Sequence, residues 1–168
     1  MKKTLIVVDM QKDFIDGVLG TKEAVAIVDA VKEKIAMYRA NGDEVIFTRD
    51  THQSNYLCTN EGKYLPVVHC VEGTEGWQIW EGLYEPGDEI IDKPTFGFLG
   101  WNQYSFEEVE LIGLCTDICV VSNALLLKAS FPEVIMTVDA SCCAGVTVEK
   151  HNAALETMKS CQIKVINE

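Results

Sequence analysis

Six short, mainly apolar runs along the chain constrain its fold more than any other feature. Residues 5–8 read Leu-Ile-Val-Val, and comparable runs follow at 45–47, 89–92, 109–112, 134–138 and 163–166. A strand without polar alternation is typical of a sheet that is buried on both faces. The runs therefore predict six strands of a covered sheet.

Helical patterns separate several of these strands. The first begins near Lys22 and keeps apolar side chains on one face as far as Tyr38, and others cover residues 117–129 and 148–160. A short helix is also predicted around residues 77–80. Strands that alternate with amphipathic helices predict a three-layer α/β fold, with a six-stranded parallel sheet between two helical layers. The chain shows no repeat or linker, so residues 1–168 are expected to form a single domain.

The composition excludes several classes of function. The net charge of −12 argues against nucleic acid or an anionic membrane as a partner. No apolar run approaches the roughly 20 residues that a membrane-spanning helix requires, and residues 4–8 are too short for the core of a signal peptide. The seven cysteines show no regular spacing, which favours free thiols in a reducing cytoplasm over a disulfide framework.

Four chemically reactive positions follow predicted strands. Asp9, Asp50 and Lys93 stand at strand ends, and Cys119 lies in the first turn of the helical pattern that follows residues 109–112. In open parallel sheets the functional site lies beyond the carboxyl ends of the strands. We therefore expect these four side chains to lie at one edge of the sheet.

Asp9, Lys93 and Cys119 are chemically complementary. A cysteine in the first turn of a helix is close to unpaired N–H groups and the helix dipole, which predicts a lowered thiol pKa. The thiolate would attack a carbonyl carbon, Lys93 would hold it by charge, and Asp9 would carry protons to a leaving group. The alternative is a structural ion pair of Asp9 with Lys93 beside a packing cysteine. Three complementary groups at one sheet edge favour the catalytic interpretation.

A second constellation lies in the long polar segment after the second strand. Asp50 and His52 are two residues apart, so both point the same way at the end of an extended strand, and His69 follows later. Carboxylate and imidazole ligands suit Zn²⁺, Mn²⁺ or Fe²⁺. From the residues alone, solvated loop histidines are the commoner explanation.

Five sequence fragments, in order, resemble those of the isochorismatase-like cysteine hydrolases and, within them, the nicotinamidases. They span nearly the whole chain, at residues 9–14, 50–52, 69–76, 93–96 and 113–120. The resemblance implies the family's three-layer α-β-α, Rossmann-like fold and its Asp–Lys–Cys triad, at Asp9, Lys93 and Cys119. It also implies a cis peptide bond between Leu114 and Cys115, which turns the N–H groups of Cys115 and Cys119 into an oxyanion hole.

The same resemblance implies a divalent metal on Asp50, His52 and His69, with Glu61 as a further ligand. Zinc is the first expectation, with manganese or iron as alternatives. In that family the metal holds the pyridine nitrogen of the substrate and leaves the carboxamide facing the cysteine. Family members commonly form dimers or tetramers, so a homo-oligomer is expected.

The chain departs from the family at the substrate pocket. Relatives commonly carry Trp-Pro-x-His before the histidine, whereas residues 66–69 here are Pro-Val-Val-His. The aromatic side chain that would help to sandwich a pyridine is therefore expected from Phe14, Trp77 or Phe98. Gly97 stands where relatives often have a serine.

These observations predict amide hydrolysis through a thioester on Cys119, with nicotinamide as the expected substrate. A second enzyme interpretation keeps the triad but acts on another small amide, such as an N-carbamoyl or ureido compound, without a metal. A third interpretation is a metal-binding or redox module in which Cys119 is only an oxidisable thiol. A vinyl-ether hydrolase of the isochorismatase type fits poorly, because such enzymes generally lack the nucleophilic cysteine.

Overall fold

The sheet at the centre of the molecule has six strands, all parallel, in the order β3-β2-β1-β4-β5-β6. The computed structural model describes all residues from 1 to 168. The strands span Lys3–Val8 (β1), Glu44–Asp50 (β2), Glu89–Lys93 (β3), Glu108–Leu114 (β4), Ile135–Ala144 (β5) and Lys164–Ile166 (β6). Each predicted strand is present, so the predicted parallel sheet is confirmed.

β1 lies in the middle of the sheet, because β2 and β4 flank it on either side. Residues 5–8 are fully buried, as their apolar sequence predicts. The register places Val8 beside Thr48 of β2 and Gly113 of β4. The carboxyl ends of three strands therefore meet next to Asp9.

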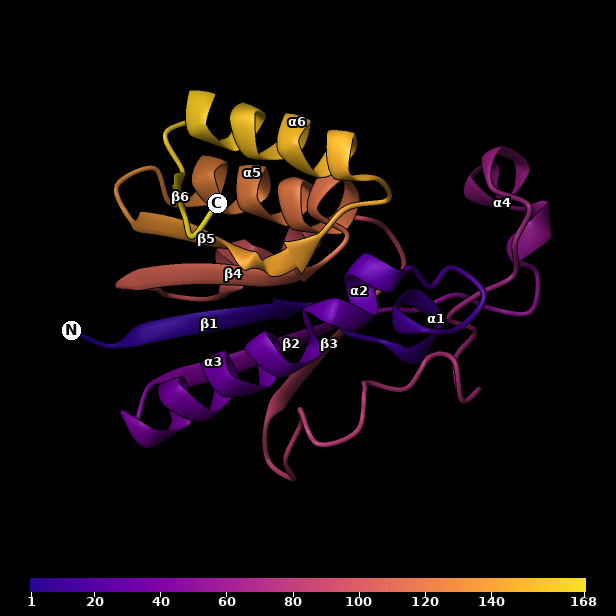
Figure 1. The fold of residues 1–168 in the computed structure, drawn as a ribbon, viewed down its shortest axis with the longest axis horizontal. Helices are drawn as coiled ribbons and strands as arrows, with labels where there is room; N and C mark the ends of the chain where they lie inside the picture. The colour runs from indigo at the N-terminus through magenta and orange to yellow at the C-terminus, as the bar shows by residue number, and fades with distance from the viewer.

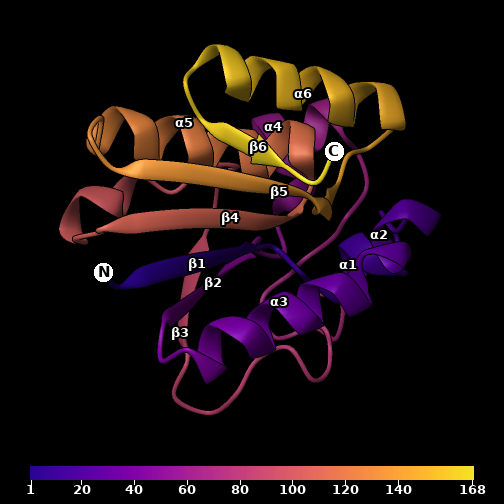
Figure 2. The ribbon, with the colours of Figure 1, turned by 60° about the vertical axis from the view of Figure 1, so that its left-hand side comes forward.

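Helices cover both faces of the sheet (Figures 1 and 2). The longer ones are α3 (Val28–Ala40) on one face, and α5 (Val121–Ser130) with α6 (Val148–Ser160) on the other. Val31 of α3 and Leu127 of α5 belong to separate buried apolar clusters, one for each face. The three-layer arrangement is therefore confirmed.

Short helical segments lie mainly in the loops beyond the strands. They are α1 (Lys12–Ile15), α2 (Lys22–Ala26), α4 (Asn60–Tyr64), the 3-10 turns η1 (Tyr56–Cys58) and η2 (Leu99–Gln103), and the π turn η3 (Thr116–Val120). Figure 1 shows α4 standing away from the sheet at the end of a long loop. None of the helices is long and apolar enough to cross a membrane.

Two helical predictions need correction. The first predicted helix is in fact two, because α2 ends and α3 begins at Ile27. The helix predicted at residues 77–80 is absent, since Ile79 forms an antiparallel bridge with Gln11. This backbone pairing holds the segment extended against the loop that follows β1.

Candidate active site and metal centre

Asp9 and Lys93 form an ion pair in the interior of the protein. Asp9 follows β1 with a φ of 47°, and its Oδ2 lies 2.7 Å from Nζ of Lys93 at the end of β3. Neither side chain is exposed. Thr48 donates its hydroxyl to the other carboxylate oxygen, Oδ1, at 2.6 Å. Burial raises the pKa of Asp9 against the opposing effect of Lys93.

Lys93 keeps its positive charge in this interior. Burial alone would lower its pKa, but the charges of Asp9 and Asp50 outweigh burial and hold the pKa above its ordinary value. Nζ also donates to the carbonyl of Thr95 at 3.1 Å. The pair therefore combines a fixed cation with a carboxylate able to accept a proton.

Cys119 lies in the π turn η3, which leads into α5. The residue is only 5% exposed, and the peptide bond between Leu114 and Cys115 just before this turn is cis, as the resemblance implies. Burial, followed by the charge of Asp9, raises the pKa of the Cys119 thiol, whereas Lys93 lowers it. The predicted lowering of this pKa is therefore wrong. The group rests as a thiol, with Asp9 near it as a proton acceptor.

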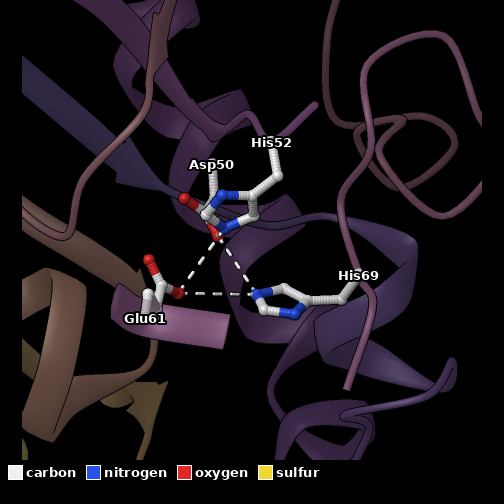
Figure 3. A group of neighbouring side chains, drawn as sticks. All are labelled: Asp50, His52, Glu61 and His69. Carbon is white, nitrogen blue, oxygen red and sulfur yellow. Dashed lines mark hydrogen bonds and ion pairs between the residues drawn. The ribbon is translucent and has the colours of Figure 1, made fainter. Parts of the chain in front are cut away.

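Asp50, His52, Glu61 and His69 gather around one point beyond the end of β2 (Figure 3). Oδ2 of Asp50 lies 2.9 Å from Nε2 of His52 and 3.4 Å from Nε2 of His69. Oε1 of Glu61, which α4 contributes, is 3.5 Å and 3.9 Å from the same two nitrogens. The structure thus brings together all four side chains that the sequence suggested as ligands.

The geometry of this metal-ligand cluster fits a divalent cation. The four ligand atoms lie within 4.8 Å of one another, and ligands of a tetrahedral zinc are separated by about 3.4 Å. Oδ2 of Asp50 is the carboxylate oxygen that faces both histidine nitrogens, whereas Oδ1 is buried without a hydrogen-bond partner, and a nearby cation would offset the cost of burying this charged group. Nδ1 of His69 donates to the carbonyl of Val67 at 2.7 Å, which leaves Nε2 as the nitrogen directed at the cluster.

Electrostatic interactions keep the side chain of Asp50 ionised. Burial would raise the pKa of Asp50, but the hydrogen bond with His52 and the close imidazole of His69, together with the charge of Lys93, lower it to about 2. Asp50 is therefore a carboxylate at neutral pH. Charged oxygen and imidazole nitrogen are ligands that zinc, manganese and iron all accept.

Two side chains that hold the cluster in place have no distinctive sequence signal. Gln11 accepts the backbone N–H of Asp50 at 2.7 Å and donates to the carbonyl of the same residue at 2.8 Å. The ring of Tyr56 packs 4.7 Å from that of His52 and 4.9 Å from that of His69, centroid to centroid. Gln11, which follows β1, bonds to the backbone at the end of β2, and spacing along the chain does not reveal such a contact.

A cavity of about 150 Å³ is lined both by Cys119 and by members of the metal-ligand cluster. Its walls are mainly apolar, and Phe14 and Phe96 supply the aromatic surface. A dry cavity of about this volume holds a benzene-sized ring in another protein. The space therefore suits a small, flat ligand.

The other two aromatic residues predicted for the pocket lie elsewhere. The ring of Trp77 lies against the guanidinium of Arg49, with Cζ 3.5 Å from the ring centroid. Phe98 packs edge-on against Trp101 at 5.2 Å between ring centroids. The predictions for Trp77 and Phe98 are wrong because each ring packs against a partner outside the cavity. Phe96, two positions before Phe98, lines the cavity instead.

Comparisons with known proteins identify the family. The sequence matches the isochorismatase domain over residues 3–168. It is 32% identical to the isochorismatase family protein PncA of Bacillus subtilis, over 74% of this chain and 78% of that protein. It is 27% identical to the nicotinamidase/pyrazinamidase of Mycobacterium tuberculosis, over 98% of both chains. The crystal structure of the pyrazinamidase of Pyrococcus horikoshii in complex with zinc has a TM-score of 0.88 at 28% identity, covering 100% of both chains.

The sheet order and the helical layers place the molecule among the three-layer α/β proteins, whose sites lie at the carboxyl ends of their strands. Because the family domain extends over nearly the whole chain, the protein belongs to the isochorismatase family. The resemblance inferred from the five sequence fragments is therefore confirmed.

Proposed function

We propose that this protein hydrolyses a small amide through a thioester on Cys119, and that its substrate is nicotinamide, which yields nicotinate and ammonia. The observation on which the proposal depends is the shared cavity, whose wall includes Cys119 as well as Asp50, Glu61 and His69 of the metal-ligand cluster. A flat ring in this space can direct a ring nitrogen to the cluster and its carboxamide to Cys119 at the same time.

The similar proteins support this choice of substrate. The relative from Mycobacterium tuberculosis is a nicotinamidase/pyrazinamidase, and the solved structure from Pyrococcus horikoshii is a pyrazinamidase. Both names describe hydrolysis of the amide group on an aromatic ring. The mainly apolar cavity with Phe14 and Phe96 in its wall is suited to such a ring.

Asp9 moves the protons of the proposed reaction. It accepts the thiol proton of Cys119 as the sulfur bonds to the carbonyl carbon, and the N–H groups of Cys115 and Cys119 stabilise the oxyanion. Asp9 then returns this proton to the nitrogen as the C–N bond breaks, which releases ammonia and leaves a thioester. A water molecule next gives a proton to Asp9 and attacks the thioester, and the sulfur leaves with that proton. Lys93 stays charged and favours the ionised form of Asp9 between steps.

The metal-ligand cluster is proposed to hold one divalent cation, with zinc as the first expectation and manganese or iron as alternatives. When bound, the cation supplies a Lewis acid to a heteroatom of the substrate ring. The zinc complex of the similar Pyrococcus horikoshii protein supports this choice of metal. Asp50, His52, Glu61 and His69 would serve as the ligands.

The proposal extends to the cellular role of the protein. Hydrolysis of nicotinamide would feed NAD salvage in the cytoplasm, and the protein is proposed to act as a homo-oligomer, either a dimer or a tetramer. The salvage role and the oligomeric state rest on resemblance to the family, and the cytoplasmic location rests on the irregular spacing of the cysteines. Size-exclusion chromatography with light scattering measures the number of copies.

Ammonia release from nicotinamide by the purified protein, with metal content measured on the same sample, tests the proposal. Turnover should fall at least about 1,000-fold in Cys119→Ala, because the nucleophile is lost, while the unfolding temperature stays close to that of the wild type. Cys58→Ala is the matched control, since Cys58 is an exposed cysteine outside the cavity, and it should keep full activity.

The possible outcomes separate the alternatives. Turnover that persists in Cys119→Ala rules out the thioester route. If the wild-type protein binds metal but releases no ammonia from nicotinamide, we infer that its substrate is another small amide, such as a ureido compound. Rapid oxidation of Cys119 without an acyl-enzyme on any amide favours the redox module instead.

A further inference from the structure

We propose that Asn123 is a positioning residue that fixes the pocket wall at Phe96 relative to the nucleophile Cys119. The inference rests on the proposed function, because Phe96 and Cys119 line the cavity assigned to the substrate. Asn123 lies on α5, four residues after Cys119, and does not line the cavity itself. It acts through the residues to which it is hydrogen-bonded.

The order of the strands explains why such a residue is needed. Lys93 ends β3 at one edge of the sheet, whereas Cys119 follows β4, and β2 and β1 lie between these two strands. No direct strand pairing therefore sets the distance between the loop that follows β3 and the helix that carries the nucleophile. That loop, residues 94–103, has to be held against α5 by other contacts.

Asn123 provides those contacts with both ends of its side-chain amide. Nδ2 donates to the carbonyl of Cys119 at 2.8 Å and to the carbonyl of Phe96 at 3.2 Å. Oδ1 accepts the backbone N–H of Phe98 at 2.9 Å and the indole N–H of Trp101 at 3.0 Å. The residue is fully buried, and the amide uses both donors and both acceptor positions. One side chain thus joins the nucleophile turn to three residues of the loop.

These hydrogen bonds matter for the shape of the pocket because Phe96 is not held in place by burial. The residue is 45% exposed, although it lines the cavity. The same loop also accepts a hydrogen bond from Nζ of Lys93 at the carbonyl of Thr95. A displaced loop would therefore move an aromatic wall of the pocket, whereas Lys93 would keep its place through its ion pair with Asp9.

A buried asparagine also contributes to stability, so the test has to separate the effect of a variant on the position of the pocket wall from its effect on the stability of the protein. Leu127 lies one turn further along α5 and is fully buried. Leu127→Ala opens a cavity in the same helix face and lowers stability, but it removes none of the four hydrogen bonds. It is the matched control for variants of Asn123.

Kinetics with nicotinamide give the first readout. Asn123→Leu should raise KM about tenfold with a change in kcat of less than about threefold, because ground-state and transition-state contacts with the wall weaken alike. Leu127→Ala should leave KM within about twofold of the wild-type value. Phe96→Ala should raise KM to a similar extent, and the double variant Asn123→Leu/Phe96→Ala should be no worse than either single change.

The indole N–H of Trp101 gives a second readout that needs no substrate. In nitrogen–proton correlation spectra, its resonance is assigned with Trp101→Phe. The resonance should shift and exchange faster with solvent in Asn123→Leu, and it should stay unchanged in Leu127→Ala. Asn123→Asp keeps the acceptor oxygen but loses both donors, so it should retain this resonance and still show a raised KM. It also serves as the test variant should Asn123→Leu fail to fold.

Two results would overturn the inference. One is an unchanged KM in both Asn123 variants, and the other is a rise of equal size in Leu127→Ala. A wild-type protein that does not hydrolyse nicotinamide contradicts the proposed function, and the Trp101 resonance then decides this inference. A shift in Asn123→Leu alone supports the link between α5 and the loop, whereas an unchanged resonance refutes it.

Discussion

At the scale of single residues, burial sets the charges on which the site depends. Asp9 and Lys93 are fully buried and lie 2.7 Å apart, so each offsets the cost of holding the other charged without water. The same burial keeps Cys119 a thiol, so the proposed attack requires Asp9 to take its proton. The ion pair therefore serves the chemistry, since buried pairs in general contribute little net stability.

Removing either partner of this pair should destabilise the protein more than removing both. Asp9→Asn and Lys93→Met each disrupt the buried pair, so each should lower the free energy of unfolding by about 3–5 kcal/mol. The double variant should be more stable than either single variant by at least about 1 kcal/mol, and none of the three should hydrolyse nicotinamide. Urea denaturation measures the three values. A double variant less stable than both single variants would show that the pair does not compensate internally.

The sequence predicts the location of these residues better than their ionisation. Asp9, Asp50 and Lys93 stand at the carboxyl ends of neighbouring parallel strands, and such ends meet at one sheet edge. The raised pKa of Cys119 could not be predicted, because a helix start is visible in a sequence whereas the depth of burial is not. Trp77 is misassigned for a similar reason, since its contact with a guanidinium depends on tertiary packing.

At the scale of elements, the pairing of β1 with β4 brings the two halves of the site together. Gly113 lies opposite Val8 with a φ of 118°, and the register between β4 and β5 shifts between Leu111 and Gly113. A Cβ at Gly113 would lie 2.1 Å from the carbonyl oxygen of Val8. Only glycine therefore allows the strand that leads to Cys119 to approach the one that leads to Asp9 so closely.

Gly113→Ala should therefore lower both stability and activity. The combined cost of the unfavourable φ and the clash with β1 is about 3 kcal/mol, and the displaced turn should reduce kcat. Gly42→Ala is the matched control, because Gly42 also has a positive φ, of 74°, but a Cβ there meets no atom within 4 Å. It should cost about 1 kcal/mol and leave kcat unchanged. Equal losses in both variants would show that contact with β1 is unimportant.

Element boundaries were less predictable than the elements themselves. The six strands follow from short apolar runs, because strands buried on both faces need no polar alternation. The break at Ile27 is hidden because the apolar face continues across it, with Ala24 and Val31 buried on either side. The segment around Ile79 is extended only because it pairs with Gln11, a residue far from it in the chain.

At the scale of the whole molecule, the metal-ligand cluster joins parts of the chain that are otherwise separate. Asp50 and His52 lie at the end of β2, Glu61 belongs to α4, and His69 lies in the loop beyond α4. Because α4 stands away from the sheet (Figure 1), a cation held by all four ligands would tie this projecting segment to the body of the protein. Metal binding should therefore affect the stability of the molecule as well as its activity.

Zinc should raise the unfolding temperature of chelator-treated protein. A ligand present at 100 times its Kd adds about 2.7 kcal/mol to the stability of the folded state. For a domain of this size, 1 kcal/mol raises Tm by about 2–4 °C, so the expected rise is about 5–10 °C. Differential scanning calorimetry with and without zinc measures this rise.

Comparing a histidine of the cluster with one outside it tests whether the zinc binds at the cluster. His69→Ala removes one of the four ligands and should abolish most of the rise in Tm, because the remaining groups bind the cation more weakly. His151→Ala is the matched control, since His151 lies outside the cluster and its Nδ1 is paired with the hydroxyl of Thr116. This variant should show the same zinc-dependent rise as the wild type. An equal rise in His69→Ala would show that zinc binds outside the cluster. The cluster would then not be the metal site, and a bound metal could not contribute to the choice of substrate.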